Sequence, residues 1–298
     1  MTDLPLWRSL LYVPVNVERY VNGAHTRGAD CIQLDLEDSV PASEKGSARG
    51  LVPSAARTVR KGGADVVVRI NRPLSLAVRD IEVSVGPDVN GLAVTKVESA
   101  DHLRLLDELV SEREVALGLA VGHTLFIALI ETPSAFFQMA EIARASRRVA
   151  GMNLGGEDFA LACGMAATQE TLLAPKQQMI FAARSAGVMP LGFIDSVASF
   201  GDWPVFRTMV RRSRQFGFMG ASCIHPGQVP IVNEEYSPAP TEVAFATRVV
   251  EASIQADAAG RGSFAMDGQM IDLPIVQRAQ QLLRRHAAIQ ARNSETAI

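Results

Sequence analysis

Short apolar runs alternate with longer segments of helical periodicity along most of this chain, and this alternation limits the folds that it can adopt. The eight apolar runs cover residues 9–15, 31–36, 66–70, 92–97, 125–130, 149–154, 191–194 and 219–224. Helical periodicity lies between them, in residues 17–27, 44–60, 100–111, 133–145, 171–186 and 204–216, with a weakly marked segment at 79–90. Strands that alternate with helices indicate parallel β-α units, because parallel neighbours need a crossover connection.

The number of runs favours a closed α/β barrel. Apolar residues at consecutive positions, as in Val66-Val67-Val68, are typical of strands that are covered on both faces. An open doubly wound sheet would give the same local pattern, but eight runs by residue 224 favour a (β/α)8 TIM barrel. We therefore expect a barrel in residues 1–232. Residues 233–298 are expected to form a C-terminal helical and hairpin extension, with a linker at 233–241, a helix at 242–259, a flap at 260–272 and a terminal helix at 274–286.

Size and charge exclude several classes of protein. The 298 residues are enough for one barrel, and 29 Lys and Arg against 32 Asp and Glu leave a net charge of −3, which does not suit a dedicated nucleic-acid binder. No apolar stretch reaches the roughly 20 residues of a membrane helix, and residues 1–8 do not read as a secretory signal. Cys31, Cys163 and Cys223 form no Cys-x-x-Cys pair, so we expect buried thiols in a cytoplasmic protein.

Polar residues follow most of the apolar runs. In a barrel of this type, the loops after the carboxyl ends of the strands build the active site. The runs end in Asp35 with Glu37 and Asp38, Arg69 with Asn71, Lys96 with Glu98, Glu131, Glu157 with Asp158, Asp195 and His225. Any one of these could simply mark where a strand reaches water. Together they bring many carboxylates and a few cations to one mouth of the barrel.

Glu131 and Asp158 are the candidate metal ligands. Neighbouring carboxylates repel and raise each other's pKa unless they share a cation. With oxygen ligands and no histidine nearby, Mg²⁺ is favoured over Zn²⁺, and a chelating 2-oxo or 2-hydroxy acid could complete the coordination. Arg69 offers a planar fork for a carboxylate or an enolate oxygen.

The segment Gly155-Gly156-Glu157-Asp158 lacks the spacing of a phosphate-binding loop. The two glycines permit a tight turn and a close approach of the backbone to a substrate oxygen, so Gly155, Gly156 and Glu157 are candidate substrate-binding residues. Glu157 or Asp158 could instead only cap the next helix. His225 could donate to a substrate, although Pro226 beside it fits a structural turn equally well.

Eight short motifs resemble the citrate lyase β-subunit-like proteins of the HpcH/HpaI aldolase and citrate lyase superfamily of CoA-ester lyases. In chain order they are RSLLYVP (8–14), LDLEDSV (34–40), VRIN (68–71), TKVE (95–98), IET (130–132), GEDF (156–159), IHPGQ (224–228) and GQMIDLP (268–274). The resemblance implies a (β/α)8 barrel in homotrimers or homohexamers, Mg²⁺ on Glu131 and Asp158, and Arg69 as the residue that binds substrate and stabilises the enolate. It also implies that Asp272 reaches a neighbouring subunit's site as the acid/base residue.

Three positions depart from the family pattern. Val15 follows Pro14 where the family has glycine, Gly23 stands where a lysine is common, and Ala221-Ser222 replaces Gly-Lys. Losing two cations and gaining a branched side chain would weaken CoA binding. The sequence therefore supports the lyase chemistry more strongly than it supports the use of a CoA thioester as the substrate.

The resulting hypothesis is Mg²⁺-dependent, reversible cleavage of a 3-hydroxyacyl-CoA of the malyl, citramalyl or citryl type into an acyl-CoA and a 2-oxo acid. Asp35 and Glu37 are expected to order metal-bound water or Arg69. Two alternatives stay open: an aldolase that acts on free 2-oxo acids without CoA, and a non-catalytic subunit that binds an oxo acid or CoA. The sequence does not choose among lyase, synthase and thioesterase action.

Overall fold

Eight parallel strands form one sheet in the computed structural model, which describes residues 4–195 and 201–295. Their order is β7-β6-β5-β4-β3-β2-β1-β8. Their bounds are β1 (Ser9–Pro14), β2 (Cys31–Asp35), β3 (Asp65–Ile70), β4 (Gly91–Val94), β5 (Leu125–Ile130), β6 (Val149–Leu154), β7 (Met189–Leu191) and β8 (Ala221–Cys223).

The two edge strands of this sheet meet, so that the sheet closes. A parallel bridge joins Leu191 to Gly220, and the Gly192 amide donates to the Gly220 carbonyl at 2.8 Å. The Met219 amide donates to the Pro190 carbonyl at 2.9 Å. These contacts confirm the predicted (β/α)8 barrel.

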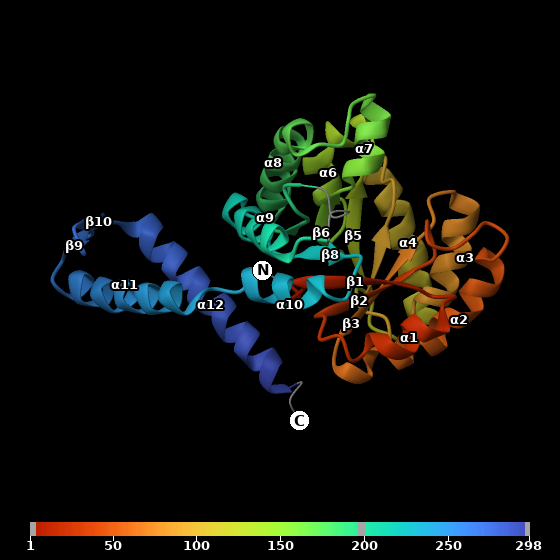
Figure 1. The fold of residues 1–298 in the computed structure, drawn as a ribbon, viewed down its shortest axis with the longest axis horizontal. Helices are drawn as coiled ribbons and strands as arrows, with labels where there is room; N and C mark the ends of the chain where they lie inside the picture. Colours follow the sequence, from red (N-terminus) through yellow and green to blue (C-terminus); the bar gives the residue numbers. More distant parts are fainter. Residues whose placement is uncertain (1–3, 196–200, 296–298) are drawn as a thin grey trace. The chain divides into compact units, whose positions relative to one another are not determined.

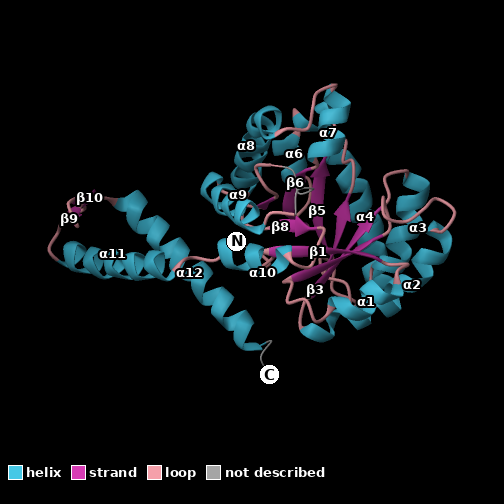
Figure 2. Cartoon of the chain, in the orientation of Figure 1, coloured by secondary structure: helices cyan, strands magenta, loops and turns pink. Residues whose placement is uncertain are grey.

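Helices surround the strands of the barrel on the outside (Figures 1 and 2). They are α1 (Glu18–Ala24), α2 (Lys45–Val59), a 3-10 turn at Arg60–Gly62, α3 (Leu74–Ser84), α4 (Ala100–Ala116), α5 (Pro133–Phe136), α6 (Met139–Ala143), α7 (Gly156–Cys163), α8 (Gln169–Ala186), α9 (Trp203–Phe216) and α10 (Gln228–Glu235).

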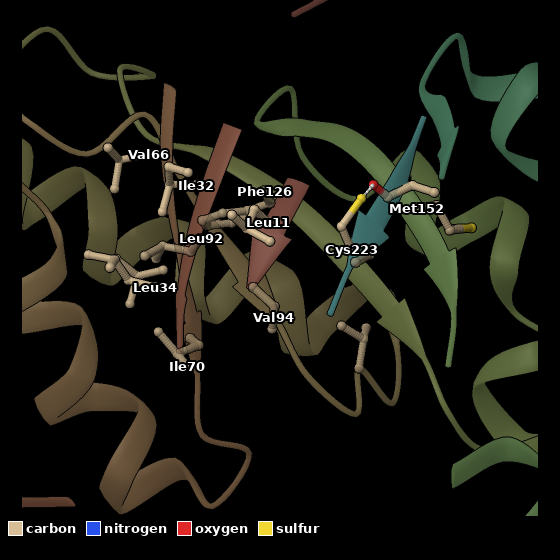
Figure 3. Close-up of a cluster of buried hydrophobic side chains, with 14 of the residues drawn as sticks. Leu11, Ile32, Leu34, Val66, Ile70, Leu92, Val94, Phe126, Met152 and Cys223 are labelled. Carbon is tan, nitrogen blue, oxygen red and sulfur yellow. Dashed lines mark hydrogen bonds between the residues drawn. The ribbon is translucent and has the colours of Figure 1, made fainter. Parts of the chain in front are cut away.

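Alternate residues of each strand face two different parts of the core. One set packs between the strands and the helices. Figure 3 labels ten members of this set, among them Leu11, Ile32 and Val66. The other set, which includes Cys31, Val67 and Ile127, fills the interior of the barrel. Because side chains alternate with a period of two, the inner face continues to Asp35, Arg69 and Glu131 at the carboxyl ends of their strands. The same alternation therefore builds the core and aims the polar side chains at the barrel mouth.

Several predicted element bounds were wrong. The seventh strand is Met189–Leu191 rather than 191–194, because Gly192 adopts a φ of +133° and ends it. The helix predicted at 133–145 is two short helices, in which Ala135, Met139 and Ile142 are buried while Phe137 between them is 85 % exposed. The helix after β3 is Leu74–Ser84, earlier than the weakly marked segment at 79–90.

The segment after β8 also differs from the prediction of a linker at 233–241. Helix α10 extends to Glu235, and the Glu235 carboxylate is buried beside Arg207 and Arg211 at 2.7 and 2.9 Å. The ion pairs with these arginines hold Glu234 and Glu235 in a helix that the local sequence did not indicate. Helix α7 was not predicted either, and Cys163 at its end is exposed rather than buried.

The chain divides into two compact units, Met1–Tyr236 and Ser237–Ile298, four residues beyond the boundary that we expected. The second unit contains α11 (Pro240–Ala258), the hairpin strands β9 (Phe264–Met266) and β10 (Gln269–Ile271), and α12 (Leu273–Glu295), which is longer than the predicted terminal helix. Asp267 and Gly268, both at positive φ, form the two-residue turn of this hairpin. Over the described residues, no helix is both long and apolar enough to cross a membrane.

Candidate active site

Arg69 is held in one orientation by the carboxylate of Asp35. The Arg69 Nε and Nη2 atoms donate to the two Asp35 oxygens, each at 2.7 Å. Backbone amides of Glu37 and Ser39 also donate to Asp35, at 2.9 and 3.2 Å. Burial alone would raise the pKa of Asp35, but the hydrogen bonds from Arg69 and these amides lower it below its usual value. The guanidinium lies over the Tyr12 ring, 4.8 Å from its centroid, so its plane is fixed as well.

Glu37 and Lys96 extend this charge network toward the centre of the barrel mouth. Glu37 is buried, with Oε2 2.7 Å from Arg69 Nη1 and Oε1 3.0 Å from the Lys96 ammonium. Burial raises the pKa of Glu37, while Arg69 and Lys96 oppose that rise. Asp35 and Glu37 therefore both contact Arg69 in this structure.

Glu131 follows β5 and lies beside the turn that carries Asp158. It is 4 % exposed, and the Lys96 backbone amide donates to its Oε2 at 2.5 Å. A Cβ on Gly155 would lie 2.7 Å from the Glu131 Cγ and Oε1, so only glycine leaves room for this carboxylate. The Lys96 ammonium is 3.5 Å from Asp158 Oδ1, which links the two carboxylates through one lysine.

Part of this charge network lines a cavity of about 210 Å³. Arg69, Glu131, Asp158 and the Gly155–Glu157 turn form part of its wall. Tyr12, Asn153, Lys176, Asp195 and Ser222 line it too, together with the apolar side chains of Leu129, Leu154, Leu172, Met179, Phe193 and Phe218. Sequence candidates that follow or end β3, β5 and β6 are thus brought together in one cavity.

The charges in this cavity fit a divalent cation. Burial raises the pKa of Glu131 to about 7, and the neighbouring Glu37 and Asp158 carboxylates act in the same direction. A cation between Glu131 and Asp158 would favour the charged form of Glu131, and hard carboxylate oxygens suit Mg²⁺. In the part of the chain that the structure describes, no three His, Cys, Asp or Glu side chains are grouped to hold a metal ion. The protein would therefore supply two ligands and leave the other positions to water and substrate.

A second cavity of about 750 Å³ adjoins the first at Tyr12 and Arg69, which line both. Its wall also includes Arg19 and Arg27 of the α1 region, Tyr20, and the Ile224–Pro226 segment after β8. Two arginines and an aromatic ring can receive an anionic ligand with a planar base.

The three departures from the family pattern lie in different environments. Val15 is 2 % exposed and belongs to the core, so its branched side chain does not enter either cavity. Gly23 is in α1, where a Cβ would lie 3.6 Å from the Arg27 guanidinium. Ser222 lines the first cavity and is hydrogen-bonded to Tyr12. Although two lysines of the family pattern are absent, Arg19 and Arg27 supply two cations to the wall of the second cavity.

The other sequence candidates have more limited roles. Asp158 lies in the first turn of α7, but the N-cap position is Gly155 and no side chain caps this helix. His225 accepts a hydrogen bond from the Gly227 amide at 3.0 Å, as a turn residue does. Asp272 belongs to the second unit, at the start of α12.

Three side chains at or beside the first cavity were not assigned roles from the sequence: Tyr12 and Lys176 line it, and Lys96 contacts Asp158 in its wall. Lys96 lies two residues after the carboxyl end of β4, so its position was a usable signal. Tyr12 and Lys176 carried none, because Tyr12 lies within an apolar run and Lys176 within a helix far from any strand end.

Comparisons with known proteins show what this chain is similar to. The model of the HpcH/HpaI aldolase/citrate lyase family matches residues 8–226. The citrate lyase subunit beta of Leuconostoc mesenteroides subsp. cremoris is 34 % identical over 95 % of this chain and 94 % of its own. The L-malyl-CoA/beta-methylmalyl-CoA lyase of Cereibacter sphaeroides is 31 % identical over 88 % of this chain and 89 % of its own.

A solved structure is similar over nearly the whole chain as well. The CitE protein of Mycobacterium tuberculosis, in complex with magnesium, acetoacetate and coenzyme A, is 29 % identical. It has a TM-score of 0.74 and covers 94 % of this chain and 97 % of its own.

Proposed function

Because the chain belongs to the HpcH/HpaI aldolase/citrate lyase family, we propose that it is a Mg²⁺-dependent carbon–carbon lyase. Its substrate is a 3-hydroxyacyl-CoA of the malyl, citramalyl or citryl type, which it cleaves reversibly to an acyl-CoA and a 2-oxo acid. The observation that carries this proposal is one cavity lined by Glu131, Asp158 and the fixed Arg69.

Glu131 and Asp158 hold the metal in this proposal. Bound there, Mg²⁺ supplies Lewis-acid polarisation of the carbonyl oxygen of the oxo acid. Gly155 and Gly156 let the backbone approach a substrate oxygen, and Glu157 lines the same wall. The Lys96 amide fixes one Glu131 oxygen and leaves the other available to the metal.

Arg69 stabilises the negative charge that forms on the acyl-CoA product. When the bond between the α-carbon and the 3-carbon of the ester breaks, its electron pair moves to the α-carbon, and negative charge develops on the thioester oxygen of the resulting enolate. Asp35 and Glu37 orient the guanidinium toward that oxygen, so it needs little reorganisation during the reaction. Asp272 shuttles the proton: it accepts the proton that leaves the 3-hydroxyl group and delivers it to the α-carbon of the acyl-CoA product.

The second cavity supports the use of a CoA thioester. It is the larger of the two and is joined to the first at Arg69, where the thioester oxygen would lie. Arg19 and Arg27 offer cations to the CoA phosphates, and Tyr20 offers a ring to its adenine. We also propose that the protein forms a homotrimer or homohexamer, because Asp272 would act on a neighbouring subunit's site. We further propose that it acts in the cytoplasm.

The first experiment is calorimetric binding of CoA and acetyl-CoA, with Mg²⁺ and either glyoxylate or pyruvate present or absent. Stronger CoA binding in the presence of metal and oxo acid supports the lyase, and screening of acyl esters then separates lyase, synthase and thioesterase products. Binding of the oxo acid without any CoA binding would indicate the free-acid aldolase. The absence of binding by any of these ligands would indicate a non-catalytic subunit.

A further inference from the structure

Lys176 is a buried lysine that the mechanism above does not use. It lies on α8, is 6 % exposed and lines the same cavity as Glu131 and Asp158. Its ammonium donates to the Asp195 backbone carbonyl at 2.9 Å. Among the residues that the structure describes, no carboxylate lies within 4 Å of this ammonium.

This lack of a close anionic partner distinguishes Lys176 from Arg69, which lines the same cavity, and from Lys96, which lies beside Asp158 in its wall. Arg69 and Lys96 each contact carboxylates at 3.5 Å or less. A buried ammonium without such a partner is unfavourable, since it has lost water and gained little in return. Burial accordingly lowers the pKa of Lys176 to about 8, although the more distant Asp195 and Glu157 carboxylates oppose this shift. An anionic ligand in the cavity would supply the missing partner.

The backbone between Lys176 and the proposed metal ligands is bare. A Cβ on Gly156 would lie 3.7 Å from the Lys176 ammonium, and a Cβ on Gly155 would overlap the Glu131 side chain at 2.7 Å. Two adjacent glycines thus have Lys176 on one side and Glu131 on the other. A small ligand chelated at Glu131 and Asp158 can therefore extend along this turn toward the lysine.

We propose that Lys176 binds a second carboxylate of the oxo acid, so that the 2-oxo acid handled by this protein is a dicarboxylic acid. This inference rests on the proposed lyase function and makes it specific. The malyl, citramalyl and citryl types of ester differ in the group on the oxo carbon, which is hydrogen, methyl or carboxymethyl. Only the carboxymethyl group of oxaloacetate gives Lys176 a charged partner. The methyl group of pyruvate cannot form an ion pair or accept a hydrogen bond from the ammonium.

The test compares oxaloacetate with pyruvate in the ester-forming direction, with acetyl-CoA and Mg²⁺, and identifies each ester by its mass. We expect the unaltered protein to have a KM at least about 10-fold lower for oxaloacetate, because a charge-assisted hydrogen bond is one of the stronger polar contacts. Lys176→Met raises the KM for oxaloacetate about 10- to 100-fold and leaves that for pyruvate within about twofold. Lys176→Arg keeps the charge and retains most of the preference.

Two further variants separate charge from structure. Lys176→Gln removes the charge but keeps an N–H donor for the Asp195 carbonyl, and it should behave like Lys176→Met. Arg184→Met is the matched control, since Arg184 is on the same helix and donates to the Gly217 carbonyl at 3.0 Å but does not line the cavity. It should leave both KM values unchanged.

Equal changes for the two acids would overturn the proposal, because they would mean that Lys176 only holds the segment after β7. A preference for pyruvate in the unaltered protein would also overturn it, even if both neutral variants failed to fold. No ester from either acid, with no binding of acetyl-CoA, would instead contradict the lyase function itself.

Discussion

Lys96 shows how single residues set the charge balance of the site. Its backbone lies in the left-handed region, with a φ of +46°, which is strained for a lysine. This conformation accompanies an amide that donates to Glu131 and an ammonium that lies between Glu37 and Asp158. One residue therefore contacts three carboxylates.

The metal assignment leads to the first prediction. Glu131→Gln and Asp158→Asn should each lower kcat/KM by about 1,000-fold or more, because each removes one of two proposed protein ligands. Calorimetry should detect no Mg²⁺ binding, and a chelator should abolish the turnover of the unaltered protein. Glu98→Gln is the control, since Glu98 is exposed and outside the first cavity. Full turnover in either ligand variant would refute the assignment.

The clearance at Gly155 supports the second prediction. Gly155→Ala should lower kcat about 10- to 100-fold, because its Cβ would displace the Glu131 carboxylate, while φ of −71° is accessible to alanine. Gly50→Ala is the matched control: Gly50 lies in α2, its Cβ would meet nothing within 4 Å, and the change should stabilise the helix by up to about 1 kcal/mol. Unchanged activity in Gly155→Ala would show that the predicted displacement does not matter.

At the scale of elements, a buried ion network joins α4 to β6. Arg148 is 3 % exposed and donates to both oxygens of Glu114, at 2.8 and 2.7 Å. It also contacts Asp107 and the Thr124 carbonyl. The Glu114 carboxylate accepts in addition from the backbone amides of Gly122 and Thr124, so the network ties the end of α4 to the loop before β5.

Removing the cation of this network gives the third prediction. Arg148→Met should lower the free energy of unfolding by about 3–5 kcal/mol, because it leaves the buried Glu114 carboxylate without its partner. Urea titration measures this change, and the KM for substrate should stay the same. Arg104→Met removes an exposed pair with Asp101 on the same helix and should cost less than about 1 kcal/mol. Equal losses in the two variants would contradict the role given to burial.

The same network gives a pH dependence, which is the fourth prediction. Burial would raise the pKa of Glu114 and of Asp107, but hydrogen bonds from Arg148 and other donors lower both below their usual values. Between the folded and unfolded pKa values the unfolded chain binds more protons, so these groups stabilise the fold above about pH 4.5 and lose this effect as pH falls. Unfolding free energies measured from pH 6 to 3.5 should fall less steeply in Arg148→Met. Parallel slopes would argue against this linkage.

At the scale of the whole molecule, the proposed reaction draws residues from both units of the chain. Glu131, Asp158 and Arg69 belong to Met1–Tyr236, whereas Asp272 belongs to Ser237–Ile298. Asp272 follows β10 directly, and buried Ile271 packs with Ala246 and Val249 of α11, which anchors the hairpin within its own unit. Asp272 is thus carried by a small element that packs within its own unit.

Mixed oligomers test this arrangement, and their behaviour is the fifth prediction. Glu131→Gln and Asp272→Asn should each be inactive alone, and their co-expression should restore a fraction of turnover, because some sites then combine an intact metal pair with an intact Asp272. Light scattering should show an oligomer. Activity that never returns in mixtures, or a fully active monomer, would contradict action between subunits.

Much of the candidate site could be predicted from local sequence, for a physical reason. Strand side chains alternate with a period of two, so the residues that extend the inner face beyond Cys31, Val67 and Ile127 had to be Asp35, Arg69 and Glu131 once a barrel was assumed. The metal pair follows from the same reasoning, because carboxylates at one mouth of a barrel repel without a cation. Each of these inferences needs only neighbouring residues and the carboxyl ends of parallel strands.

Only the tertiary structure decided which of these groups are paired and which are not. Contacts between residues far apart in sequence, such as those of Lys96 with Glu37 and Asp158, depend on how neighbouring strands align around the closed barrel. Lys176 is the clearest case: the helical pattern of α8 gives it no distinction, and its burial beside Gly156 follows from how that helix packs against the turn after β6. The sequence by itself determined that eight strands alternate with helices, and which polar residues follow the strands. Packing determined the cavities and the charges left without a close partner, since both depend on distances that no local pattern encodes.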